Sequence, residues 1–204
     1  MIPNVDQIPD GWQLVRLDDI AEIVGGSTPS RAAKEYWDGS IPWVVPSEIT
    51  ELSGRYLSST KESITDVGRK STGLKILPSN SILLTSRATI GELAINTIPV
   101  TTNQGFQNVV VKNGTDLLWL YYLLNSMRHE LRRRASGSTF LEISRDSVRS
   151  LPILLPTLEE QRAIAAMLDS VDYVIETGQE EVAQQRELRT ALSEALLTGW
   201  VRAP

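Results

Sequence analysis

The stretch Leu151-Pro152-Ile153-Leu154-Leu155-Pro156-Thr157-Leu158-Glu159-Glu160 decides how the chain is organised. Its two prolines are incompatible with a helix, because proline lacks the backbone donor and restricts the residue before it. Thr157 and Glu160 then stand at the spacing of a capping box, which begins a helix. No further proline occurs until the last residue, and Gly199 is a natural stop. The sequence therefore predicts a single helix over residues 158–198, about 60 Å long at 1.5 Å per residue.

The predicted helix carries a narrow apolar seam at the spacing of a coiled coil. The seam consists of Ile164, Leu168, Val171, Ile175, Val182, Leu192 and Leu196. Gly178, Gln185 and Arg189 fall on the same seam and weaken it, and Gly178 alone costs roughly 1 kcal/mol relative to alanine. A narrow stripe on a lone helix cannot bury itself. The helix therefore either pairs with a helix of another subunit, which we favour, or folds back on its own domain.

Short strand and helix patterns alternate in the residues that precede this boundary. We expect a short helix over 17–24, a strand over 41–45 after a hairpin-type turn, and a strand over 109–111. Short apolar runs within 74–98, broken by turn residues, are typical of a small sheet. The sequence predicts an α+β chain: a compact mixed sheet-and-helix domain over residues 1–157, then a long coiled-coil-type helix in residues 158–204.

One further helix is expected from Asp116 to Ala135. Asp116 is a suitable N-cap, and Gly137 suits the position after the helix end. Four arginines cluster near the C-terminal end of this helix, at Arg128, Arg132, Arg133 and Arg134. Arginines there complement the helix dipole, so we assign a structural role to at least half of them.

Charge is distributed unevenly along the 204 residues, whose formal net charge is -5. Residues 1–51 hold three Lys/Arg and nine Asp/Glu, residues 52–157 hold thirteen and seven, and residues 158–204 hold four and nine. A nucleic acid would be attracted to the positive middle only, although such asymmetry also arises as ordinary surface variation. The chain has no cysteine, no run of eighteen apolar residues, and a polar, acidic start unlike a signal peptide. We therefore expect a cytoplasmic protein.

Residue constellations that support catalysis are missing from the sequence. His129 is the single histidine, so neither a zinc site of several histidines nor a convincing Ser-His-Asp triad can be built. There is no phosphate-binding loop of the Gly-Lys-Ser/Thr type. The adjacent carboxylates Asp18-Asp19 and Glu159-Glu160 suit helix N-terminal positions. We expect no enzyme activity, no metal and no cofactor.

Eight short segments together resemble a known family, the specificity (S) subunits of type I restriction-modification systems. The segments are, in chain order, IPDGW (8–12), GGSTPS (25–30), GSIPW (39–43), SRATIG (86–91), TNQGF (102–106), GST (137–139), LEEQRAIA (158–165) and LLTG (196–199). Each segment is weak alone, but in this order they cover nearly the whole chain.

The resemblance implies a target recognition domain, residues 1–157, followed by a spacer helix, residues 158–204. Members of this family usually carry two such units in tandem, and each unit reads one half of a bipartite DNA site. They are non-catalytic and bring a methyltransferase subunit and a restriction subunit to double-stranded DNA. This chain has one unit and so resembles a half-subunit, which would act as a homodimer, pair with a different half-subunit, or be a remnant. We favour a homodimer.

DNA-facing residues are chosen by chemistry, because the base-reading loops vary within the family. Phosphates favour Lys, Arg and small hydroxyls, and base edges favour Arg, Lys, Asn or Gln in exposed loops. The candidates are Thr28, Ser30, Arg31, Lys34, Arg55, Lys61, Arg69, Lys70, Arg87, Asn103 and Gln104. For Asn103 and Gln104, a structural turn that bonds the backbone is as well supported as a DNA contact. For Arg87, a buried ion pair is as well supported as a phosphate contact. Four aromatic residues are assigned to the core rather than to stacking platforms, namely Trp12, Tyr36, Trp37 and Trp43.

Two other functions stay open from the sequence. The chain could be an interaction or scaffold protein that uses the long helix without reading DNA. It could also be an enzyme with an unrecognised site, which turnover by the isolated chain would reveal.

Overall fold

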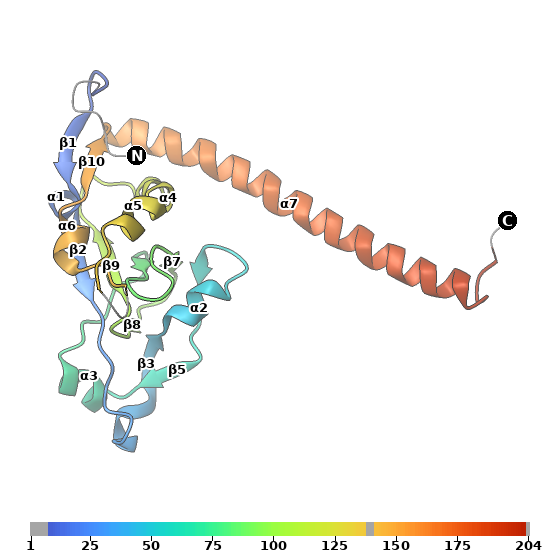
Figure 1. The fold of residues 1–204 in the computed structure, drawn as a ribbon, viewed down its shortest axis with the longest axis horizontal. Coiled ribbons are helices and arrows are strands. Elements are labelled where there is room, and N and C mark those ends of the chain that lie inside the picture. The colour runs from blue at the N-terminus through green and yellow to red at the C-terminus, as the bar shows by residue number, and fades with distance from the viewer. Residues whose placement is uncertain (1–7, 138–140, 203–204) are drawn as a thin grey trace. The chain divides into compact units, whose positions relative to one another are not determined.

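The structure, a computed structural model, describes residues 8–137 and 141–202. Its contacts divide the chain into two compact units, Met1–Arg162 and Ala163–Pro204. The first unit contains three small sheets and several short helices, and the second is the greater part of one long helix (Figure 1). This mixed sheet-and-helix architecture with a long C-terminal helix is the predicted α+β class.

A five-stranded sheet holds the main core of the first unit. Its order is β2 (Ala21–Gly25), β9 (Gln107–Val111), β6 (Ile82–Leu84), β7 (Leu93–Asn96) and β4 (Tyr56–Leu57). Every residue of β6 is buried, which explains its uninterrupted apolar sequence. Phe106, just before β9, is fully buried in a cluster with Leu83 and Ala94. The small sheet expected over 74–98 is confirmed.

A second, three-stranded sheet has the order β5 (Glu62–Ile64), β3 (Trp37–Val44) and β8 (Thr101–Thr102). Its own small core contains Trp43, Ile64 and Leu74. Two short helices pack against it, η2 (Lys34–Tyr36) and α3 (Asp66–Thr72), while α2 (Pro46–Thr50) follows β3 and contributes Ile49 to the core of the five-stranded sheet. The strand expected over 41–45 is therefore the second half of a longer strand.

The third sheet joins the beginning of the unit to its end. β1 (Gln13–Arg16) pairs antiparallel with β10 (Pro152–Leu155), in the register Gln13 to Leu155. Beside this pair lie α1 (Leu17–Ile20) and α6 (Arg145–Arg149). Pro152 takes the first position of β10, where a strand tolerates proline.

The helix expected over 17–24 is wrong after Ile20. The chain turns there into β2, in which Ala21 and Ile23 are buried and Glu22 between them is exposed. That alternation has the period of a strand, and pairing with β9 satisfies its backbone. The sequence of residues 21–24 is compatible with both a helix and a strand, and pairing with β9 selects the strand.

The single helix expected from Asp116 to Ala135 is also wrong, because it is two helices. They are α4 (Leu117–Ser126) and α5 (Arg128–Arg133), and they meet at Met127, whose ψ of 7° departs from helical geometry. The turn brings Arg128 to within 3.0 Å of Glu92 Oε1. The N-cap is confirmed, since the Asp116 side chain accepts from the backbone N–H of Trp119 at 2.9 Å.

All four arginines of this region are engaged in ion pairs. Arg128 and Arg132 reach Glu92, while Arg133 and Arg134 reach Glu130. Glu130 is buried, and hydrogen bonds from Arg133 and then Arg134 lower the pKa of its carboxyl to about 2. These arginines therefore have a structural role.

The variant Glu130→Gln should be less stable than the wild type by about 1–3 kcal/mol at pH 7, because it leaves two guanidinium groups without their charged acceptor. The folded pKa lies below the ordinary value of 4.5. The stability from this carboxylate is therefore present above about pH 4.5 and is lost as the pH falls toward 2. Urea unfolding at pH 7 and pH 3 should show the deficit shrinking at the lower pH. The control Glu35→Gln, at an exposed carboxylate, should change neither curve; an equal loss in both variants would refute the assignment.

The long helix, α7 (Leu158–Leu197), confirms the single helix expected over 158–198. At its start the Thr157 hydroxyl accepts from the backbone N–H of Glu160 at 3.3 Å. Gln161 is buried in the first unit, where its Oε1 accepts from the backbone N–H of Asp116 at 2.8 Å. At its end Gly199 adopts a φ of +79°, as expected for a helix stop. None of the helices in the described part of the chain combines the length and the apolar character that a membrane span requires.

Candidate nucleic-acid interface and helix face

Three loops that are distant in the sequence come together in the first unit. The backbone N–H of Ser27 donates to Thr102 O at 2.9 Å, and the backbone N–H of Ser86 donates to Gly105 O at 2.7 Å. A Cβ on Gly26 would lie only 1.9 Å from Asn103 O. Only glycine allows this close approach. The segments GGSTPS, TNQGF and SRATIG are thus parts of one site.

The side chains of residues 28–34 and 103–104 form what we call the loop surface. Its members are Thr28, Ser30, Arg31, Lys34, Asn103 and Gln104, all of them candidates from the sequence. The Thr28 hydroxyl donates to Gln104 Oε1, which ties the two segments together. Asn103 Oδ1 accepts from the backbone N–H of Gly105 at 2.8 Å. This is the turn contact anticipated for Asn103, while the Gln104 side chain is exposed.

Arg31 is held in one position on the loop surface. Its guanidinium pairs with both carboxylate oxygens of Glu62, one of them at 2.9 Å, and lies 3.7 Å from the ring centroid of Trp37. The hydrogen bond from Arg31 lowers the pKa of the Glu62 carboxyl, although partial desolvation opposes the effect. Arg31 is half exposed, so it is preorganised and still accessible.

The tryptophans beneath Arg31 support the loop rather than offering a stacking face. Trp43 is 1% exposed and donates from Nε1 to Ser27 O at 3.1 Å. Trp37 packs edge-on against Trp43 and donates to Ser30 O at 3.1 Å. Trp43 belongs to the core, as expected, and Trp37 packs against it.

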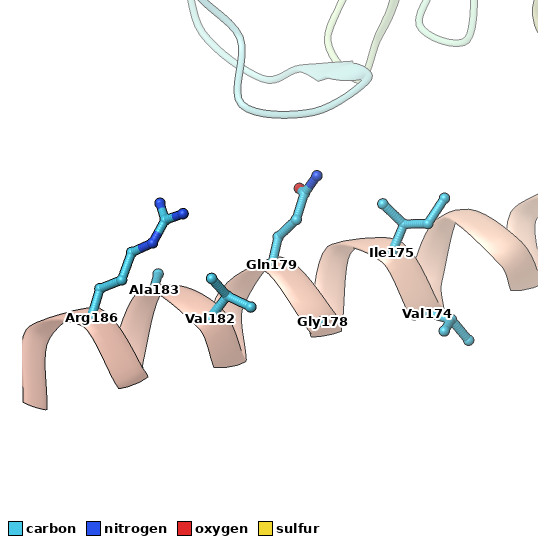
Figure 2. A pocket seen from close by; sticks show the side chains of 7 residues that line it. All are labelled: Val174, Ile175, Gly178, Gln179, Val182, Ala183 and Arg186. Atoms are coloured by element: carbon cyan, nitrogen blue, oxygen red, sulfur yellow. The ribbon is translucent and has the colours of Figure 1, made fainter. Parts of the chain in front are cut away.

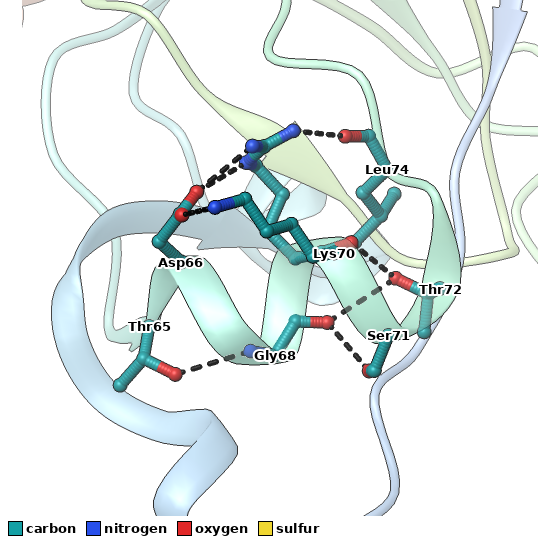
Figure 3. Close-up of polar contacts among 8 residues, drawn as sticks. Thr65, Asp66, Gly68, Lys70, Ser71, Thr72 and Leu74 are labelled. Carbon is teal, nitrogen blue, oxygen red and sulfur yellow. Dashed lines mark hydrogen bonds and ion pairs between the residues drawn. The ribbon is translucent and has the colours of Figure 1, made fainter.

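Arg69 and Lys70 lie on α3, whose polar contacts are drawn in Figure 3. Both pair with Asp66, and hydrogen bonds from Lys70 and then Arg69 lower the pKa of that carboxyl. Arg69 also donates to Leu74 O at 3.3 Å, which closes the C-terminal end of α3. Because α3 packs against η2, Lys34 and Lys70 come from neighbouring elements.

The remaining three candidates lie outside the loop surface. Lys61 pairs with Glu51, and its backbone N–H donates to the buried Glu48 at 2.7 Å. Arg55 donates to the Tyr122 hydroxyl of α4 at 2.6 Å. Arg87 follows Ser86 at the border of the loop surface and pairs with Glu142 at 2.9 Å. The ion pair anticipated for Arg87 exists, but it is partly exposed rather than buried.

Arg145, the first residue of α6, was not among the candidates. Its guanidinium occupies the space in which a Cβ on Gly25 would lie, with the Nη2 atom 2.3 Å from that position. It is exposed and pairs with no carboxylate among the described residues. No local sequence pattern signals this placement, because Gly25 and α6 are brought together only by the fold.

Within residues 8–137 and 141–202, no group of three or more His, Cys, Asp or Glu side chains could hold an ion. Ser138 and Thr139 of the segment GST lie outside the described residues.

The second candidate surface is the apolar face of α7. Six of the seven seam residues are at least 40% exposed within this chain, and Ile164 is partly buried. The exposed six are Leu168, Val171, Ile175, Val182, Leu192 and Leu196. Gly178 leaves a gap between Ile175 and Val182, and these residues line a shallow hollow on the helix (Figure 2). The seam predicted from the sequence is therefore an open apolar surface.

Comparison with known proteins identifies the family. Residues 9–185 match the model of the type I restriction modification DNA specificity domain. The specificity subunit of the type I restriction enzyme MjaIX from Methanocaldococcus jannaschii is 38% identical over 97% of this chain and 45% of its own length. The specificity subunit of EcoR124I/EcoR124II from Escherichia coli is 29% identical over 85% of this chain and 44% of its own length. The chain thus spans about half the length of these relatives.

Solved structures show the same fold. The HsdS subunit from Thermoanaerobacter tengcongensis superposes with a TM-score of 0.68, at 22% identity over 93% of this chain and 45% of that one. A chain from a solved type I R-M system superposes with a TM-score of 0.73, at 24% identity over 95% of this chain and 48% of that one. With the family model matched over most of its length, the chain belongs to the family of type I restriction-modification DNA specificity domains.

Proposed function

We propose that this chain is the DNA-recognition subunit of a type I restriction-modification complex, and that it reads one half of a bipartite double-stranded site. The loop surface carries the proposal: polar and cationic side chains from two distant segments gather on a rigid, glycine-dependent scaffold. Hydroxyl, amide and guanidinium groups are those that contact phosphates and base edges. Belonging to the specificity-domain family supports the same role.

In this proposal the chain is non-catalytic and acts in the cytoplasm. The chemistry would come from a methyltransferase (M) subunit and a restriction (R) subunit, which the chain would bring to the target. Residues 1–157 would recognise DNA and residues 158–204 would connect the subunits. The eleven DNA-facing candidates stay a prediction, with the loop surface as the part whose geometry favours it most.

The proposed partner of α7 is a second copy of the chain. The exposed seam carries apolar residues at heptad spacing, so two copies can bury it against each other. Each recognition unit is connected to the start of its helix, so an antiparallel pair places one unit at each end. A pair with two-fold symmetry then requires inverted half-sites on the duplex.

The mapped target should therefore be palindromic around a non-specific spacer. Sequencing of methylated bases in cells that contain the M subunit, with and without this chain, should reveal inverted half-sites. Inserting one heptad after Glu187 adds about 10 Å of helix and should lengthen the spacer by roughly three base pairs. Two unrelated half-sites read by a pure single-chain preparation would exclude the homodimer.

DNA recognition itself is tested with the chain assembled with its M subunit. Fluorescence anisotropy should show binding that weakens steeply as salt rises, because phosphate contacts release counterions. Weak, salt-insensitive binding would instead favour a scaffold protein that uses only the exposed face of α7.

A further inference from the structure

Most cations near the loop surface are already engaged with carboxylates. Arg31 pairs with Glu62, Lys70 with Asp66 and Arg87 with Glu142. A paired cation must give up part of an existing interaction to bind a phosphate, so it contributes less than a cation that is unpaired. The phosphate contacts should therefore come first from cations without a carboxylate partner.

Lys34 and Arg145 have no carboxylate partner among the described residues; Lys34 is the last residue of the 28–34 part of the loop surface, and Arg145 lies against Gly25, just before that part begins. Lys34 lies in η2, at one end of residues 26–34. Arg145 lies against Gly25, at the other end, where α6 packs on β2. Thr28, Ser30 and Arg31 lie between Gly25 and Lys34 along the chain. Cations on both sides of a reading loop are placed as phosphate contacts that fix the loop's register on a duplex.

We propose that Arg145 contacts the DNA backbone beside the loop surface, and that Gly25 is needed because it leaves room for the Arg145 guanidinium. This inference rests on the proposed DNA-recognition function and adds a residue to its site. The contact carries no sequence information, so it supplies affinity and register to target and non-target DNA alike.

Gly25 gives a specific test because of what its missing side chain would touch. The three atoms nearest to a Cβ there would all belong to the guanidinium of Arg145, at 2.3 to 3.6 Å. These atoms are the far end of a flexible, exposed side chain, so Gly25→Ala should displace Arg145 without disturbing the fold. Gly26, the next residue, differs because its Cβ would meet the backbone oxygens of Thr102 and Asn103.

The experiment measures DNA affinity of the chain assembled with its M subunit, on target and random duplexes, across a salt series. Arg145→Ala should weaken binding to both duplexes by about three- to tenfold at physiological salt and reduce the salt slope by about one unit. Arg145→Lys should recover part of the loss. The control is Arg149→Ala, which removes a cation of the same helix that pairs with Asp18 and should leave the slope unchanged.

A double-mutant cycle tests the role of Gly25. Gly25→Ala alone should reproduce much of the loss, but in the Arg145→Ala background it should add nothing. Gly54→Ala, where a Cβ meets no atom within 4 Å, is the matched control. Full additivity of the two losses would overturn the role assigned to Gly25.

The failures of the two proposals are distinguishable. If the wild-type assembly does not bind DNA in a salt-dependent way, the proposed function falls. If it binds and Arg145→Ala matches wild type or Arg149→Ala in affinity and slope, the inference about Arg145 falls and the proposed function stands. Thermal unfolding of each variant should give wild-type midpoints, and Arg145→Lys supplies a second reading if Arg145→Ala unfolds.

Discussion

Replacing Leu168 and Ile175 with aspartate should convert a dimer of this chain into monomers. Both side chains belong to the apolar seam of α7, and they are 40% and 50% exposed in the single chain. Burying a side chain of this size contributes about 1.5–3 kcal/mol, and a symmetric pair would contain each one twice. The substitutions remove that contribution and place four carboxylates in an apolar contact, which adds a desolvation cost. The dissociation constant should rise by several orders of magnitude.

Sedimentation velocity over nanomolar to micromolar concentrations measures this effect directly. The control Tyr173→Asp introduces the same residue on α7 at a side chain that is 71% exposed and off the seam, and it should leave the dimer intact. The double variant should also lose binding to the complete bipartite target. A wild type that is monomeric at micromolar concentration, alone and with its M subunit, would contradict the prediction.

Substituting Gly26 with alanine should disrupt the loop surface. The added Cβ would lie 1.9 Å from Asn103 O and 2.4 Å from Thr102 O. These atoms are backbone, and Thr102 O also accepts from the Ser27 N–H, so neither segment can yield without breaking the contact between them. Overpacking of this kind costs about 1–3 kcal/mol or more. Loss of the arrangement of Thr28 and Gln104 should lower target affinity at least a hundredfold if these residues read bases.

Urea unfolding and DNA anisotropy on the same preparations separate the two effects. Gly54→Ala should leave both unchanged. Stability and target affinity both at wild-type values for Gly26→Ala would mean that the close approach at Gly26 does not hold the site together.

Helix boundaries that depend on neighbouring residues could be predicted from the sequence. The ends of α7 follow from the Thr157 cap and the stop at Gly199, both of which are local. The helix over 17–24 and the break at Met127 could not be predicted in the same way. The first depends on pairing of β2 with β9, and the second coincides with the ion pair between Arg128 and Glu92, which immediately precedes the distant strand β7.

In the candidate site, too, the sequence predicted local chemistry but not the contacts between distant segments. Chemistry alone selected Thr28, Arg31 and Gln104, and the fold brings their segments together. The sequence could not reveal that Arg31 is bound to Glu62, nor that Arg145 has no carboxylate partner among the described residues. Charge pairing between distant segments leaves no trace in the order of residues, so an inventory of cations could not separate neutralised from available ones.

The pairing of β1 with β10 also constrains the order in which the protein can fold. Gln13 pairs with Leu155, and almost the whole sequence of the first unit lies between these two residues. Such non-local contacts form slowly because a long loop must close first. During synthesis β1 has no partner strand until β10 has left the ribosome. By then the strands of the five-stranded and three-stranded sheets have all been synthesised. The closing sheet, together with the Gln161 anchor to Asp116, should therefore be a late folding event, completed as α7 begins to emerge. Pulse-labelling hydrogen exchange should show the amides of β6 and β7 protected before those of β1.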